Sequence, residues 1–215
     1  MPTAAPSPAT ATRRPFSHVL ALVGALLVGA GAVAMGSRVL GRAPEPPRLG
    51  ALPDFRLVER SGRPLSLADL RGRPWVADFI FTRCGGACPA MTARMARLRR
   101  DVSPEVPFVS FTVDPAHDTP EVLARYAAAF RASEGWRFVT GAQKDLYALS
   151  VGGFKLAAME VPAGEQAAGG DGPFLHSSKF VLIDGEGVIR GYYDSTDEPA
   201  MRTLVADAAA LQAGR

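Results

Sequence analysis

A short apolar strand, a turn that holds both cysteines of the chain, and a helix follow one another between residues 75 and 100. Residues 75–81 have the length and composition of a buried strand, and residues 89–100 place methionine and leucine at helical spacing. Pro89 suits the first turn of that helix, where its fixed φ is favourable and its missing N–H is not needed. A strand that leads into a helix through a tight turn is typical of an α/β fold.

The rest of the chain continues the alternation of strands and helices. Thr119 and Pro120 provide an N-cap and a first helical residue, and Asp184-Gly185-Glu186-Gly187 is a strong hairpin signal. Strands are predicted at residues 106–113, 138–140, 180–183 and 188–193, and helices at residues 120–130, 143–151 and 198–211. This order predicts a thioredoxin-like α/β sandwich, a central mixed sheet flanked by helices, over residues 54–213.

The segment before this domain has three parts. Residues 1–18 are predicted to form a short disordered tail. Residues 19–36 are an 18-residue run without a charge, and as a helix they would span about 27 Å, near the lower limit for crossing a bilayer. We predict a transmembrane anchor or uncleaved signal here, although small residues at 32 and 34 also fit a cleavage site. Residues 37–53 contain four prolines and are predicted to be a stiff linker.

The charge of the chain argues against a nucleic-acid ligand. The formal net charge of +3 comes from residues 1–45, whereas residues 46–215 carry 20 basic and 20 acidic side chains. The short N-terminal tail favours a single pass through the inner (cytoplasmic) membrane, with the C-terminal domain facing the periplasm or exterior. That compartment is oxidising, so a dithiol there needs a metal or a reductase to remain reduced.

Cys84 and Cys88 are the only cysteines, and they lie four residues apart at the expected start of a helix. Side chains at that spacing share one face of a helix, so the two sulfurs can form a disulfide or hold a soft metal. Gly85 and Gly86 give the turn the freedom to do either, and the helix N-terminus favours the thiolate. A closed site of four cysteines for zinc is excluded, because there is no second pair.

His176 is the histidine best placed to join the cysteines. It follows a glycine- and alanine-rich segment at residues 163–173, a long loop of the kind that is often functional. A thioredoxin-like fold brings this part of the chain beside the cysteine turn. Two thiolates and one imidazole form a soft site suited to Cu(I) and able to hold Cu(II). His18 and His117 are expected to lie at the membrane interface and in solvent.

Three motifs together resemble the Sco/SenC family of copper chaperones. They are Cys84-x-x-x-Cys88-Pro89, the stretch from Val113-Asp114-Pro115 through Asp118-Thr119-Pro120 to Leu123, and His176-Ser177-x-x-Phe180-x-Leu182-Ile183-Asp184.

The resemblance covers about residues 50–213 and implies a thioredoxin fold in which Cys84, Cys88 and His176 bind copper. It also implies that the protein delivers copper to the dinuclear copper site of cytochrome c oxidase, or reduces the cysteines of that site. The implied partners are the copper-bearing subunit of the oxidase and a periplasmic thiol reductase or another copper chaperone. The stretch from residue 114 to 123 is similar to a structural signature of the family and is assigned no chemistry.

Two residue choices keep a redox role open. The insert between the cysteines is Gly85-Gly86-Ala87, where family members commonly carry an acidic residue. Asp78 lies six residues before Cys84 in an otherwise apolar strand, where thioredoxins similarly place a buried proton acceptor. The alternative for Asp78 is that it merely reaches the edge of the sheet.

Other functions fit the sequence less well. The main one is a thiol–disulfide oxidoreductase in which copper is incidental, so whether the chain is an enzyme is left open. A peroxidase would leave Cys88 and His176 without a role. Arginines on the helix after the cysteines fit a solvated face, or a surface for an acidic partner.

Overall fold

The computed structural model describes residues 45–160 and 174–214. None of the helices in these two stretches is long and apolar enough to cross a membrane. The expected tail, the apolar run at residues 19–36 and the loop at residues 163–173 lie outside the described residues, so those expectations stay predictions.

An eight-stranded mixed sheet forms the centre of the domain, with the order β1-β10-β9-β4-β5-β6-β2-β3. A separate pair, β7 and β8, is antiparallel. The strands of the sheet are β1 (Gly50–Ala51), β2 (Arg56–Glu59), β3 (Pro64–Ser66), β4 (Trp75–Ile80), β5 (Phe108–Thr112), β6 (Trp136–Thr140), β9 (Lys179–Ile183) and β10 (Val188–Asp194). The pair consists of β7 (Ala158–Glu160) and β8 (Phe174–His176).

The three central strands β4, β5 and β6 are parallel, and every residue of β4 and β5 is buried. Strands buried on both faces are nearly continuous apolar runs, and for this reason they could be predicted from the sequence. Because β4 and β5 run in the same direction, the turns that follow them lie at the same edge of the sheet. The turn after β4 carries Cys84.

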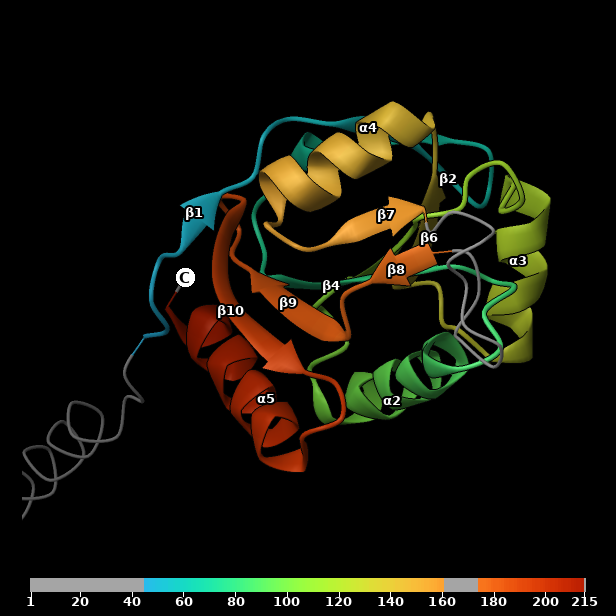
Figure 1. Cartoon of the computed structure of the whole chain (residues 1–215). Coiled ribbons are helices and arrows are strands. Elements are labelled where there is room, and N and C mark those ends of the chain that lie inside the picture. Colours follow the sequence, from blue (N-terminus) through green and yellow to red (C-terminus); the bar gives the residue numbers. More distant parts are fainter. Residues whose placement is uncertain (1–44, 161–173, 215) are drawn as a thin grey trace, which may run out of the picture. The chain divides into compact units, whose positions relative to one another are not determined.

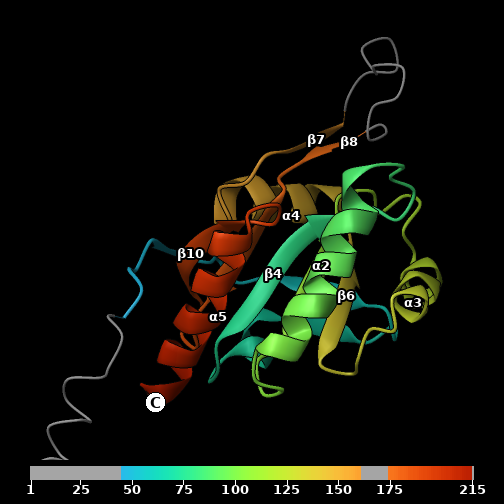
Figure 2. The ribbon, with the colours of Figure 1, turned by 90° about the horizontal axis from the view of Figure 1, so that it is seen from below.

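Helices cover both faces of the sheet (Figure 1). α2 (Ala87–Asp101), α3 (Pro120–Ala129) and α5 (Glu198–Ala213) lie on one face, and α4 (Gln143–Tyr147) lies on the other. α4 continues into a π-helical turn, η2 (Ala148–Gly153), and a short 3-10 helix, η1 (Leu67–Leu70), follows β3. Figure 2 shows α2 and α5 side by side across the sheet.

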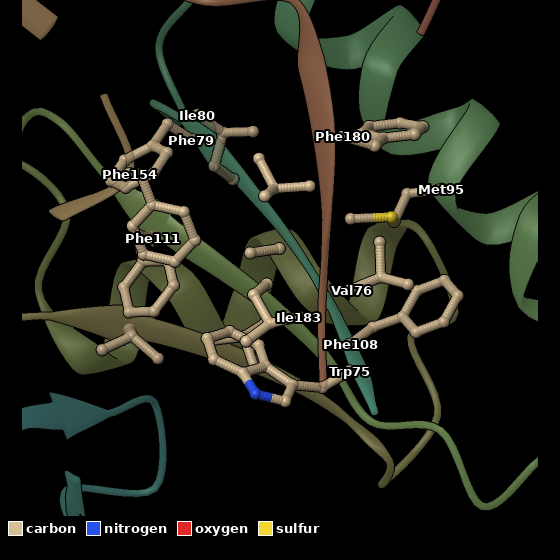
Figure 3. Packing of buried hydrophobic residues seen from close by; sticks show 14 of the residues in the cluster. Trp75, Val76, Phe79, Ile80, Met95, Phe108, Phe111, Phe154, Phe180 and Ile183 are labelled. Atoms are coloured by element: carbon tan, nitrogen blue, oxygen red, sulfur yellow. The ribbon is translucent and has the colours of Figure 1, made fainter. Parts of the chain in front are cut away.

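Aromatic rings fill the core between the sheet and α4. Phe79 stacks on Phe111 with 5.3 Å between ring centroids, and Phe154 meets Phe79 edge to face at 5.2 Å. Figure 3 shows these three rings on one side of the central strands, and Met95 of α2 beside Val76 on the other. Offset and edge-to-face pairs of this kind add to the free energy that comes from burying the rings.

Most predicted elements are confirmed, with small shifts of their ends. Thr119 accepts a hydrogen bond from the backbone N–H of Val122 at 3.4 Å, as an N-cap does, and Pro120 is the first residue of α3. The helix after the cysteines begins at Ala87, two residues earlier than predicted, so Cys88 lies inside it. The strands β1, β2, β3, β7 and β8 were not predicted.

Residues at the end of the expected linker contact the domain. Arg190 of β10 is buried and donates hydrogen bonds to the backbone carbonyls of Pro46 and Pro47, at 3.0 and 3.1 Å from Nε. Its two terminal nitrogens pair with Glu45 at 3.0 Å and with Asp184 at 2.9 Å. The chain is therefore fixed to the domain from residue 45 onward.

Candidate metal centre

The structure brings Cys84 and Cys88 together at the N-terminus of α2. Cys84 lies in the turn after β4 and Cys88 is the second residue of the helix. Both are free thiols, and their exposed fractions are 6% and 0%. The backbone N–H of Cys88 donates to Cys84 Sγ at 3.4 Å. The pair is thus a preformed, water-shielded set of two sulfur donors.

Burial sets the acidity of the second cysteine. The pKa of Cys88 is raised, first by burial, with the nearby Cys84 and Asp78 raising it further. The expected preference of the helix N-terminus for a thiolate is outweighed at this position. Cys88 is therefore a protonated thiol at neutral pH until a metal or an oxidant displaces the proton.

Asp78 lies in the middle of β4 and is completely buried. Neither of its carboxyl oxygens has a hydrogen-bond partner among the described residues. Burial raises the pKa of Asp78 to about 7, against a smaller lowering effect of Ser110 on the neighbouring strand. The alternative in which Asp78 reaches the sheet edge is wrong, because β4 has β5 and β9 on its two sides.

A buried network ties the cysteine turn to the polar turn after β5. Asp118 accepts hydrogen bonds from Thr82 N–H at 3.1 Å, from Thr82 Oγ1 at 2.5 Å and from Thr112 Oγ1 at 2.5 Å. Asp114 accepts from Arg83 Nε at 2.5 Å. Thr82 and Arg83 immediately precede Cys84, so these two acids hold the backbone that presents it.

The same turn contains a second group of possible metal ligands. Asp114, His117 and Asp118 place ligand atoms within 4.8 Å of one another. The two carboxylates, however, already accept hydrogen bonds from Arg83 and from Thr82. His117 is 44% exposed and its Nδ1 lies 2.9 Å from Asp118 Oδ1. The group therefore serves first as a clamp on the cysteine turn.

The backbone of His176 lies in β8. Phe174, two residues earlier in the same strand, contacts the cysteine turn. The Phe174 and Phe81 rings are 5.4 Å apart, and the Arg83 guanidinium is 5.9 Å from the Phe174 ring. Positions 174 and 176 belong to the same face of the strand, because successive positions alternate. Figure 2 shows β7 and β8 at the same end of the molecule as the start of α2. The side chain of His176 is outside the described part, so its part as a ligand stays a prediction.

Sequence reasoning missed the clamp formed by Asp114 and Asp118. Both acids were noted as part of a recurring signature, but without a role. A signal was available, since the signature directly follows one predicted parallel strand and the cysteine turn follows another. Polar residues after neighbouring parallel strands meet at the same sheet edge.

The chain is similar in sequence and in fold to known proteins. The SCO1 protein homolog of Bacillus subtilis is 33% identical over 158 residues, which are 71% of this chain and 78% of that protein. The structure of BsSco, described as a Sco-family cytochrome c oxidase assembly protein with a disulfide switch, is 29% identical with a TM-score of 0.66. The matched region covers 80% of this chain and 99% of the BsSco chain.

The copper-bound structure of Bradyrhizobium japonicum ScoI shares the fold, with a TM-score of 0.62 at 21% identity. The matched region covers 75% of this chain and 99% of the ScoI chain. The SCO1/SenC family description matches residues 44–211. This match spans most of the chain and includes the cysteine turn, its buried clamp and β8, and the chain therefore belongs to the SCO1/SenC family.

Proposed function

We propose that this protein is a membrane-tethered copper chaperone that serves the dinuclear copper site of cytochrome c oxidase. The observation that carries the proposal is the pair of buried thiols at the start of α2, with the strand of His176 packed against the same turn. Soft sulfur donors in a water-shielded site favour Cu(I), and an added imidazole would let the site hold Cu(II) as well. The copper-bound ScoI structure supports copper as the metal that members of this family bind.

Copper would be held by Cys84, Cys88 and His176 as cargo. Binding to the cysteines displaces the Cys88 proton, since a ligating sulfur is a thiolate. The charge of the buried Asp78 raises the pKa of Cys88. The pKa of Asp78 itself, about 7, suits it to accept the proton that Cys88 releases. The clamp residues Asp114 and Asp118 would keep the turn in place while metal enters and leaves.

Copper titration of the full chain in detergent tests this proposal. Wild-type reduced protein should retain about one copper against a moderate chelator, and Cys84→Ala, Cys88→Ala and His176→Ala should each lose it. His117→Ala is the matched control, because it removes an imidazole from the adjacent turn. If His117→Ala loses copper and His176→Ala keeps it, the metal belongs to the Asp114–His117–Asp118 group and the proposed site is wrong.

The cellular setting is a second part of the proposal. Residues 19–36 would anchor the chain in the inner membrane, with the domain in the periplasm or at the exterior, where it meets the copper-bearing subunit of the oxidase. A periplasmic thiol reductase or another copper chaperone would keep the cysteines reduced or supply the metal. The assembly role described for BsSco supports this setting. A strain without the chain should lose oxidase activity, and wild type but not Cys84→Ser should restore it.

Asp78 favours a second candidate function, a thiol–disulfide oxidoreductase. In this reaction Cys84 and Cys88 give two electrons and two protons to a partner disulfide. A disulfide forms between them, and the partner becomes a dithiol. Asp78 would accept the proton of Cys88 as its sulfur becomes a nucleophile. Under this alternative His176→Ala leaves the exchange rate intact, whereas Asp78→Asn slows it and Cys84→Ser abolishes it.

A further inference from the structure

A groove lies between the second half of α2 and the end of α3, away from the cysteines. It encloses about 520 Å³ and reaches down to Trp136 at the start of β6. Figure 2 shows α2 and α3 on either side of β6. Alanines at positions 93, 96 and 129 line it, and their small side chains leave the space open.

Four arginines and no acidic residue line this groove. Arg97, Arg100 and Arg131 are exposed, and within residues 45–160 and 174–214 none of them has an ion-pair partner. Arg99 differs from these three, because it donates hydrogen bonds to the carbonyls of Ser103 and Pro104 at 3.2 and 2.9 Å. Its side chain is therefore held in place as part of the wall of the groove.

Ordinary structural roles do not explain the three exposed arginines together. A cation in the last turn of a helix offsets the helix dipole, which accounts for Arg99 and Arg100. Arg97 lies before that turn. Arg131 directly follows the C-cap of α3, and its φ of 53° is the left-handed conformation that commonly ends a helix, at a position where glycine is the usual residue. Residues 46–215 are neutral overall, so the groove is a local excess of positive charge.

We propose that the α2–α3 groove docks an acidic peptide segment of a partner protein, with apolar side chains between its carboxylates. The unpaired guanidinium groups would meet the carboxylates, and the alanine-lined hollow over Phe130 and Trp136 would take the apolar side chains. A lipid surface fits less well, because it is flat and cannot enter a hollow.

The position of the groove suits a partner of the cysteine site. Arg97 is nine residues after Cys88 on the same helix, which is about 14 Å along the helix axis. A segment docked there leaves the turn at Cys84 uncovered and within reach of the rest of the partner. The docking does not depend on copper, so Cys84→Ser/Cys88→Ser protein should bind the segment as wild type does.

Fluorescence anisotropy with the full chain in detergent tests the proposal. The probe is a labelled 12-residue peptide that alternates glutamate with leucine and phenylalanine. A glutamine version, a glutamate-only peptide and phosphatidylglycerol vesicles are measured beside it. The test variant is Arg97→Glu/Arg100→Glu/Arg131→Glu, with Arg97→Gln/Arg100→Gln/Arg131→Gln as a milder form. Arg56→Glu/Arg63→Glu/Arg73→Glu is the matched control, since these three arginines are also exposed and lie in β2 and in two loops, outside the groove.

We expect salt-sensitive binding of the alternating peptide that weakens by roughly tenfold or more in the groove variants and is kept in the control. Weaker binding of the glutamate-only peptide would support the apolar part of the site. Equal loss in the control triple, no binding of the peptide by wild type, or binding of vesicles in its place would each overturn the proposal. Unchanged thermal unfolding of the glutamine variant shows that a loss of binding is not a loss of fold.

Discussion

A single buried carboxyl, Asp78, links the fold to the chemistry of the cysteine turn. Its pKa is about 7 in the folded protein, against an ordinary value of 3.8. Between these two pH values the folded state holds a proton that the unfolded chain has released. The free energy of unfolding therefore falls as the pH rises from about 4 to about 7, and it stays reduced above pH 7. Asp78 thus costs stability at the pH where it is useful.

Replacement of Asp78 by asparagine should remove this cost. We expect Asp78→Asn to be more stable than wild type at pH 8, by on the order of 2–4 kcal/mol, and about equally stable at pH 4. Urea unfolding of the two proteins at pH 4, 6 and 8 measures the difference. A difference that stays constant over this range would show that Asp78 does not titrate in it.

The buried clamp makes the opposite prediction for Asp118. This carboxylate is fully buried and accepts two hydrogen bonds from Thr82 and one from Thr112, and its Oδ1 also lies 2.9 Å from His117 Nδ1. Asparagine offers one oxygen in place of two and turns an N–H₂ group toward a donor. We expect Asp118→Asn to lower the free energy of unfolding by about 2–4 kcal/mol and to weaken copper binding. Asp101→Asn, at an exposed position of α2, is the control and should change either quantity little.

Among the elements, the β7–β8 pair is the part that copper binding should depend on most. It is only three residues long on each strand, and the packing of Phe174 on Phe81 joins it to the cysteine turn. Phe174→Ala should release the strand that carries His176. If the competent arrangement falls to about a tenth of the molecules, copper affinity falls about tenfold.

Phe79→Ala provides the contrast for this test. Phe79 lies in the aromatic core of the sheet, so its loss should lower the free energy of unfolding by about 3–5 kcal/mol. Phe174→Ala should move the urea midpoint less than Phe79→Ala does. Unchanged copper affinity in Phe174→Ala would separate β8 from the metal site.

Differences between the elements also explain which parts of the fold could be predicted from the sequence. β4, β5 and β9 are mostly apolar runs with clear ends, β10 follows a hairpin signal, and α3 has a capping threonine followed by proline, so the local sequence pattern was enough to predict them. β8 has three residues and exists only by pairing with β7, which no local pattern reveals. The cysteine pair was predicted from its spacing and its place between a strand and a helix, whereas the clamp of Asp118 on Thr82 required knowing that β4 and β5 are neighbours.

At the scale of the whole molecule, Arg190 joins segments from the two ends of the domain. Its buried guanidinium binds Glu45 and the carbonyls of Pro46 and Pro47 on one side and Asp184 on the other. The described chain is therefore held against the sheet from Glu45 onward, several residues before the first strand.

Arg190→Met tests this junction. It leaves Asp184, which is 7% exposed, without its buried partner, and it frees the carbonyls of Pro46 and Pro47. We expect the free energy of unfolding of the full chain to fall by about 3–5 kcal/mol, with Arg190→Lys in between because lysine cannot reach both sides at once. Arg94→Ala is the matched control, because its pair with Glu198 is 34% and 71% exposed and lies away from this junction. Its loss should cost at most about 1 kcal/mol. Equal effects of Arg190→Met and Arg94→Ala in urea unfolding would mean that the buried junction stabilises the domain no more than an exposed ion pair does.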